Sequence, residues 1–334
     1  MLIDLEQADV IDIETQSQLN NHPSMNLINQ FISPVKACTI AFLCLGIFSC
    51  SDDSQSSKPE SASEGLSLKK VVIALKANKN PEKMLAEKEA FETYLSAQLS
   101  RPVEVLIPTD SSVVVESFRN GTLDLGYLSS TDAARNLDQD TASILLIHLK
   151  NGKPNYQSIW LSLKDRTYQS IEELQDKPVA FASRSSTSGY LIPVWDLTKR
   201  GLAGKEKALN DFFSKTIYGT GYVSAVEKVL SGEVEAAAVS DYVLEGDNKY
   251  LNDEQKSRLR IIQKQGPVPS HTICARASLS ASDRAILQEA LLAMNQQNPT
   301  LRDQVFNGEL VVVDQDTHLQ VTREALEVQK TLKP

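Results

Sequence analysis

Residues 177–193 read KPVAFASRSSTSGYLIP, in which an apolar run rich in strand-forming residues is followed by hydroxyl side chains, a glycine and a helical pattern. All but one of the residues from 183 to 188 carry a hydroxyl group. Serine and threonine are poor inside helices but favourable at helix starts, where their oxygens accept hydrogen bonds from free backbone N–H groups. The stretch therefore predicts a strand, a turn and a helix, with hydroxyls that serve either as helix caps or as a cradle for an anion.

Strand and helix patterns alternate on both sides of this stretch. The predicted strands are 68–75, 102–108, 123–128, 143–149, 177–183, 215–220, 234–240 and 270–276. The predicted helices are 79–99, 110–121, 130–137, 170–175, 222–232 and 281–296. Such alternation predicts an α/β fold with doubly wound, mostly parallel sheets.

Two extended runs, YQSIWLSL (156–163) and RLRIIQKQ (258–265), divide this pattern, and we expect them to be crossings between two α/β lobes. Lobe one is predicted to comprise 67–157 and 268–334, and lobe two 158–267 with the two crossings. In doubly wound sheets, ligands bind at the carboxyl ends of strands, where helices begin. We therefore expect the ligand in the cleft between the lobes.

Polar side chains occur at several of these predicted strand ends. The candidate ligand-binding residues are Tyr127, Ser129, Ser130, Thr131, Ser185, Ser186, Thr187, Ser188, Tyr222, Asp241, Tyr242 and His271. A helix N-terminus presents free N–H groups and the positive end of the helix dipole, so it can bind an oxyanion without any lysine. The alternative is that both hydroxyl-rich turns are ordinary caps and that Tyr222 and Tyr242 are core aromatics.

The STSGYLIP turn after KPVAF, preceded by SIEEL (170–174), resembles the phosphate-, phosphite- and phosphonate-binding lipoproteins of bacterial ABC importers. The resemblance covers about 71–292 and includes GTGYVSAVEKVLSGEVEAAAV (219–239) and QGPVPSHTICAR (265–276). It implies a type II periplasmic binding protein that delivers a small phosphorus oxyanion to a permease in the inner membrane. It further implies that Ser186, Thr187 and Ser188 bind the oxyanion, with Tyr127 and 129–131 closing from lobe one. Asp241 would then meet an amine or hydroxyl of the ligand.

Two departures from the family pattern leave the preferred oxyanion open. Tyr222 follows Gly221 where family members often carry a histidine. The turn LSST (128–131) stands where the family more often has Leu-Gly-Pro.

The N-terminal segment predicts export and lipid anchoring. The apolar residues 37–48 follow Lys36, and this run is too short to span a bilayer but suits a signal peptide. It leads into IFSC (47–50), which resembles a lipobox, so Cys50 is the predicted lipidation site. Residues 1–49 would be a leader, with Met25 as an alternative start, and 50–66 a flexible tether. We expect a periplasmic location or the outer face of the cell membrane; a signal peptide with a chance cysteine and a cytosolic protein are the alternatives.

Several functional classes are disfavoured by composition. The formal net charge of −9, without a lysine or arginine block, argues against nucleic acid as a partner. GTGYVS (219–224) lacks the third glycine of a dinucleotide fingerprint, and the scattered histidines form no metal set, so we expect neither a cofactor nor a metal. Cys274 would be the one cysteine not removed with the leader or lipidated, and its apolar surroundings predict a buried strand. A monomeric solute-binding protein is favoured over the alternative, a periplasmic enzyme acting on a small phosphate ester or another anion.

Lipidation at Cys50 predicts how the protein partitions in the cell. The Cys50→Ser variant should move from the membrane fraction to the soluble fraction, because the acylated side chain is lost. Cys44→Ser, inside the apolar run, is the matched control and should leave the protein with the membranes. Immunoblots of the separated fractions measure both, and membrane retention of Cys50→Ser would rule out the anchor.

Overall fold

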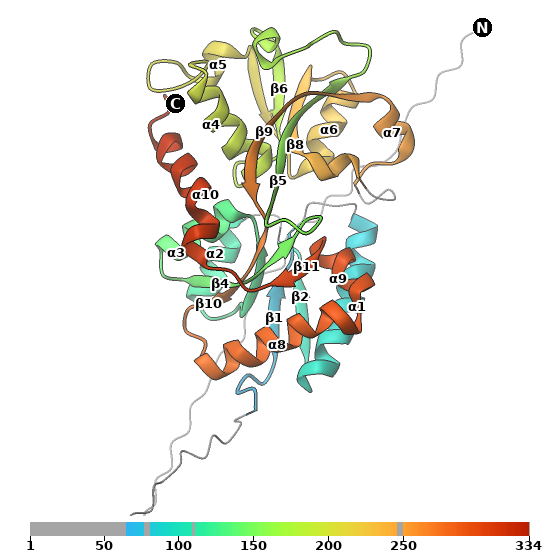
Figure 1. Cartoon of the computed structure of the whole chain (residues 1–334), viewed down its shortest axis with the longest axis vertical. Helices are drawn as coiled ribbons and strands as arrows, with labels where there is room; N and C mark the ends of the chain where they lie inside the picture. The colour runs from blue at the N-terminus through green and yellow to red at the C-terminus, as the bar shows by residue number, and fades with distance from the viewer. Residues whose placement is uncertain (1–64, 77–80, 109–110, 246–249, 334) are drawn as a thin grey trace, which may run out of the picture. The chain divides into compact units, whose positions relative to one another are not determined.

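The computed structural model describes residues 65–76, 81–108, 111–245 and 250–333 (Figure 1). The predicted signal peptide and the lipidation site Cys50 lie outside these residues. Among the helices of the described ranges, none has the length and apolar character needed to cross a membrane.

The first lobe is built on a six-stranded sheet with the order β11-β4-β10-β3-β1-β2. Its strands are β1 (Val71–Ala74), β2 (Val103–Leu106), β3 (Leu125–Leu128), β4 (Ala142–Leu149), β10 (Thr272–Arg276) and β11 (Glu309–Val311). Its helices are α1 (Pro81–Leu99), α2 (Ser111–Arg119), α3 (Ser130–Asp138), α8 (Ala281–Gln297) and α9 (Pro299–Phe306). Phe91, Leu95, Leu125 and Phe306 form part of the buried core of this lobe.

The second lobe contains a five-stranded sheet with the order β7-β6-β8-β5-β9. Its strands are β5 (Asn155–Leu163), β6 (Pro178–Phe181), β7 (Lys215–Tyr218), β8 (Ala236–Ser240) and β9 (Leu259–Pro269). Around them lie η1 (Ile171–Leu174), η2 (Thr187–Leu191), α4 (Ile192–Lys199), α5 (Leu209–Phe212), α6 (Tyr222–Leu230), η3 (Asp241–Leu244) and α7 (Asp253–Ser257). Trp160, Phe181 and Phe213 pack together in its core, and full burial of such a side chain stabilises the fold by ~1.5–3 kcal/mol.

The predicted two-lobed α/β architecture is present, but each sheet is mixed rather than mostly parallel. Parallel pairing is confined to β2-β1-β3 in the first sheet and β7-β6-β8 in the second. β5 and β9 pair antiparallel from Asn155↔Pro269 to Leu163↔Leu259, and Figure 1 shows them running side by side toward the first lobe. Because the chain enters and leaves the second lobe along this one pair, the two strands must run in opposite directions.

The predicted helices end at residue 296, and the structure adds helix α10 (Gln315–Lys330). Asp314 caps it by accepting a hydrogen bond from Thr317 N at 2.9 Å. The helix packs against α3 of the first lobe and against α4 and β9 of the second (Figure 1). Just beyond it, Lys333 N donates to Gly204 O at 2.9 Å. The domain boundaries stay a prediction, but the C-terminal segment contacts both lobes.

The turn between β6 and η2 depends on the absence of a side chain at Gly189. Its N–H donates to Ser186 Oγ at 3.0 Å. A Cβ built there would collide with Ala182 Cβ and would lie 3.1 Å from the carbonyl oxygen of Ala238. The close approach of η2 to β8 therefore requires glycine.

Replacing Gly189 by alanine should lower the free energy of unfolding by roughly 1–3 kcal/mol, the usual cost of overpacking a well-packed site. Gly65→Ala is the matched control, because a Cβ at Gly65 would have no atom within 4 Å. Thermal denaturation of both variants measures the effect. An unchanged melting temperature for Gly189→Ala would contradict the steric argument.

Candidate ligand-binding site

The two hydroxyl-rich turns meet directly at Thr187. Its Oγ1 accepts a hydrogen bond from Thr131 N at 3.0 Å and lies 2.8 Å from Thr131 Oγ1 and 3.0 Å from Ser130 Oγ. All three side chains are buried. Because α3 begins at Ser130 and η2 at Thr187, the N-terminal ends of two helical segments from different lobes face each other.

Other hydroxyls in these turns serve as helix caps. Ser129 Oγ accepts from Asp132 N at 3.1 Å, and Ser186 Oγ accepts from Gly189 N. Ser129 Oγ also lies 2.9 Å from the carbonyl oxygen of Ser185, to which it can donate across the two lobes. The capping interpretation thus holds for Ser129 and Ser186, whereas Ser130, Thr131 and Thr187 are directed at one another.

Ser188 links the second turn to a group of tyrosines. Its Oγ lies 2.8 Å from the Tyr222 hydroxyl and accepts from the Tyr156 hydroxyl at 3.4 Å. The Tyr242 hydroxyl donates to that of Tyr222 at 3.3 Å. Burial raises the pKa of Tyr156 and of Tyr242 well above the ordinary value, so both hydroxyls stay protonated. These neutral groups can donate hydrogen bonds to an anion.

Tyr127 and His271 lie on the lobe-one side of this region. The Tyr127 hydroxyl donates to the carbonyl oxygen of Phe306 at 2.9 Å and lies 3.0 Å from His148 Nδ1. The ring of His271 lies 5.3 Å from that of Tyr127 and 6.1 Å from that of Tyr156, centroid to centroid. The hydroxyl of Tyr127 therefore contacts groups of its own lobe and not the hydroxyls of the two turns.

Asp241 lies at the start of η3, next to the crossing strand β5. Its Oδ2 accepts from Gln157 N at 3.3 Å and its Oδ1 from Tyr242 N at 2.9 Å. Burial raises the pKa of this carboxyl group, and the nearby negative charge of Glu245 acts in the same direction. Asp241 thus provides a partly buried acceptor at the edge of the site.

Two residues near the turns were not among the predicted site residues. Ser158 Oγ on β5 donates to the carbonyl oxygen of Ser188 at 2.6 Å, and Gln265 Nε2 on β9 donates to Ser158 Oγ at 2.7 Å. They connect the crossing strands to the second turn. The signal in the sequence is a serine directly before the apolar run IWL (159–161), and because the structure buries it fully, its hydroxyl needs a hydrogen-bond partner.

The buried Asp132 in the first turn of α3 is balanced by a lysine. Lys76 Nζ lies 3.4 Å from Asp132 Oδ2, and Ser129 Oγ lies 2.8 Å from the same oxygen. The ion pair compensates a negative charge that would otherwise lie unbalanced beside an anion site.

The described residues contain no group of three or more His, Cys, Asp or Glu side chains placed to hold a metal ion. Cys274 is buried, and burial raises the pKa of its thiol to about 12. Because the thiolate is the nucleophilic form, this cysteine is inert at neutral pH.

Residues 73–317 match the family described as the ABC transporter, phosphonate, periplasmic substrate-binding protein family. The chain belongs to this family. It is accordingly a substrate-binding protein that acts in phosphonate or phosphate transport in the periplasm, and the family is one of transport proteins rather than enzymes.

Similar proteins agree with this assignment. The chain is 24% identical over 232 residues to the phosphate-import protein PhnD of Mycolicibacterium smegmatis. The aligned region covers 68% of this chain and 72% of that protein. PhnD1 of Prochlorococcus marinus in complex with methylphosphonate has a TM-score of 0.68 at 19% identity, covering 79% of this chain and 99% of that one. A binding protein component of an ABC phosphonate transporter from Pseudomonas aeruginosa gives 0.68 at 18% identity, covering 78% and 87%. The type II periplasmic binding protein fold is confirmed.

The raised pKa of Asp241 predicts a pH dependence. Its folded-state pKa lies above the unfolded value, so its contribution to stability is present at low pH and is lost as the pH rises through the folded value. The unfolding free energy of Asp241→Asn relative to the wild type should therefore increase as the pH rises from about 4. Asp253→Asn, whose parent side chain is 92% exposed, is the control and should give a difference that varies less with pH. Urea denaturation at several pH values measures both, and a constant difference for Asp241→Asn would contradict the expectation.

Proposed function

We propose that the chain captures a small phosphorus oxyanion between the two hydroxyl-rich turns and delivers it to the membrane permease of its transporter. The observation that carries this proposal is the convergence of Thr131 N–H and the hydroxyls of Ser130 and Thr131 on Thr187 Oγ1. An oxygen atom from the second lobe already occupies the point at which the start of α3 donates hydrogen bonds. A ligand oxygen takes this place when the turns part, and the Thr187 hydroxyl then donates a hydrogen bond to the ligand.

The chemistry of the surrounding groups suits an oxyanion. The starts of α3 and η2 contribute backbone N–H groups and, for the longer helix α3, the positive end of its dipole. Ser188, Tyr156, Tyr222 and Tyr242 add hydroxyl groups on the second side. Charge-assisted hydrogen bonds of this kind contribute about 1.5–3 kcal/mol each. Binding of this type relies on directed hydrogen bonds, so the ligand keeps its own charge when it is released.

Ligand entry requires the lobes to separate. Ser130, Thr131, Thr187 and Ser188 are each almost completely buried in the present arrangement, and a cluster of apolar residues that includes Leu128 and Leu191 spans both lobes. The β5–β9 pair is the covalent connection about which such an opening takes place. Hydrogen bonds through Ser158 and Gln265 connect the carbonyl group of Ser188 to these two strands.

The class of ligand follows from the family and its members. A relative imports phosphate, and a structural neighbour was solved with methylphosphonate. Phosphonate, phosphite and phosphate differ by one substituent on phosphorus. Asp241, as a partly buried acceptor, favours ligands that carry a P–O–H or an amine there and disfavours a fully charged dianion.

Ser185, Tyr127 and His271 complete the proposed site as residues around its edge. The remaining parts of the proposal concern assembly: lipid attachment through Cys50, action as a monomer at the periplasmic face of the membrane, and a permease in the inner membrane as partner. They are supported by the lipobox-like IFSC sequence and by the transport role of the family.

Thr187→Val tests the site because it keeps the size of the side chain and removes its oxygen. The affinity for the preferred oxyanion should fall roughly ten- to hundred-fold, the equivalent of one charge-assisted hydrogen bond. Calorimetric titrations with methylphosphonate, phosphite and phosphate measure it.

The matched control is Thr198→Val in the same lobe, where the hydroxyl donates to the carbonyl oxygen of Val194 inside α4. It should keep wild-type affinity. If Thr187→Val lowers the melting temperature but leaves the dissociation constant unaltered, the turns are structural caps and the proposed site is wrong.

A further inference from the structure

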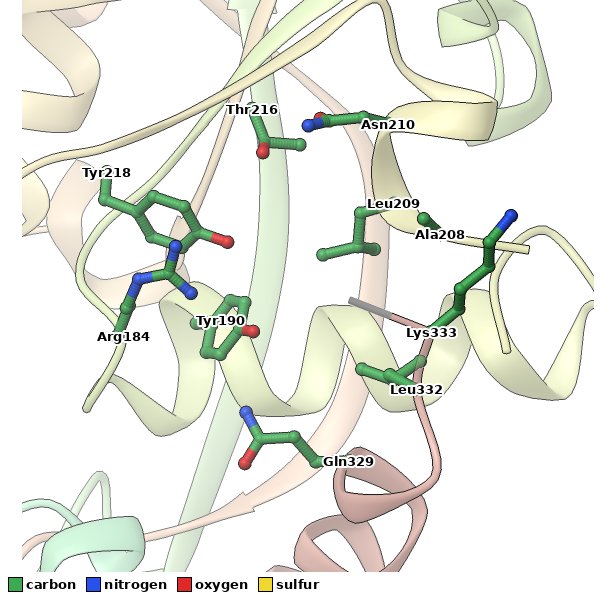
Figure 2. Close-up of a pocket in the computed structure, with 10 residues that line it drawn as sticks. All are labelled: Arg184, Tyr190, Ala208, Leu209, Asn210, Thr216, Tyr218, Gln329, Leu332 and Lys333. Atoms are coloured by element: carbon green, nitrogen blue, oxygen red, sulfur yellow. The ribbon is translucent and has the colours of Figure 1, made fainter. Parts of the chain in front are cut away.

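A second pocket, of about 260 Å³, lies in lobe two, beside the C-terminal residues (Figure 2). Three separate segments contribute to its lining: Arg184 of the β6–η2 turn with Tyr190 of η2, residues between 208 and 218, and residues between 329 and 333. Its volume lies slightly below the range of about 300–1,000 Å³ that is usual for ligand pockets, so it suits a small ligand. Thr187 and Ser188 do not line it, so it is distinct from the proposed oxyanion site.

One end of the pocket is cationic. The guanidinium carbon of Arg184 lies 3.9 Å from the centre of the Tyr218 ring, a cation–π contact that holds the side chain over that ring. Within the part of the chain that the structure describes, no carboxylate forms an ion pair with Arg184. Lys333 at the opposite rim pairs with Asp211 at 3.0 Å, and none of the residues that line the pocket is Asp or Glu.

The other end is apolar. Leu209 and Leu332 face the pocket from opposite segments, with the buried ring of Tyr190 below Arg184 and Tyr218 (Figure 2). Burial raises the pKa of Tyr218 to about 12, so its hydroxyl is a neutral donor. Figure 2 therefore shows a hollow with a planar cation on one side and leucine side chains on the other.

We propose that this pocket binds small organic monoanions, with a carboxylate against Arg184 and a flat apolar body between Leu209 and Leu332. The guanidinium group is planar and can donate two parallel hydrogen bonds to one carboxylate. The Tyr218 ring holds the exposed Arg184 side chain over the pocket, and the bond from Lys333 N to Gly204 O holds the C-terminal wall, which lowers the ordering cost of binding. The inference does not depend on the oxyanion function.

Benzoate is the probe that matches this pocket, and benzamide is its neutral counterpart. In chemical-shift titrations of the isotope-labelled chain, benzoate should perturb the amide signals of Arg184, Asn210 and Lys333, and benzamide should bind at least tenfold more weakly. Arg184→Gln should weaken benzoate binding at least tenfold. Arg119→Gln, an exposed arginine on α2 paired with Glu116, should leave it unchanged.

Thr187→Val separates this site from the proposed oxyanion site, since it should retain wild-type benzoate affinity while losing oxyanion affinity. Absence of benzoate binding, equal affinity for benzamide, or equal affinity in Arg184→Gln would each overturn the proposal. Loss of benzoate binding in Thr187→Val would likewise overturn it, because the probe would then occupy the oxyanion site. A failure of Thr187→Val to reduce oxyanion affinity bears on the proposed function alone.

Discussion

The contact on which the rest of the site depends is the one between Thr187 and the first residues of α3. A helix N-terminus carries unsatisfied N–H groups, and burying them without a partner is costly. Here the partner is an oxygen atom from the other lobe, at 3.0 Å from Thr131 N. The arrangement satisfies buried donors while it keeps an oxygen atom at the place where a transported oxyanion would bind.

The groups around this contact are polar, and the buried charge among them is paired. Tyr156 and Tyr242 are protonated because burial raises their pKa values, and the buried Asp132 is balanced by Lys76. A fixed positive charge would strengthen binding but would also slow release. A transport protein must both bind its ligand and release it. Hydrogen bonds between the lobes allow release, because they break when the lobes separate.

The helices and strands that depend on local sequence patterns were predicted correctly. The strand–turn–helix at 177–193, the strands β1 to β4 and the helices α1, α3, α6 and α8 follow from local periodicity and capping residues. The antiparallel direction of β5, β9 and β10 could not be predicted from local patterns, because strand pairing is decided by residues that are distant in the sequence. Helix α10 was also not predicted, and its packing against α3, α4 and β9 depends on how the two lobes are arranged in the tertiary structure.

The sequence by itself determined the α/β class, the family and the two turns that carry the hydroxyl groups, because these depend on local patterns and on motifs within single segments. It could not decide which hydroxyls are caps and which face the other lobe. Ser186 and Thr187 are neighbours with similar chemistry, yet one bonds its own turn and the other bonds Thr131 of α3, 56 residues away in the chain. Only the packing of the two lobes makes that distinction, since a hydroxyl group bonds whichever partner the fold brings within about 3 Å.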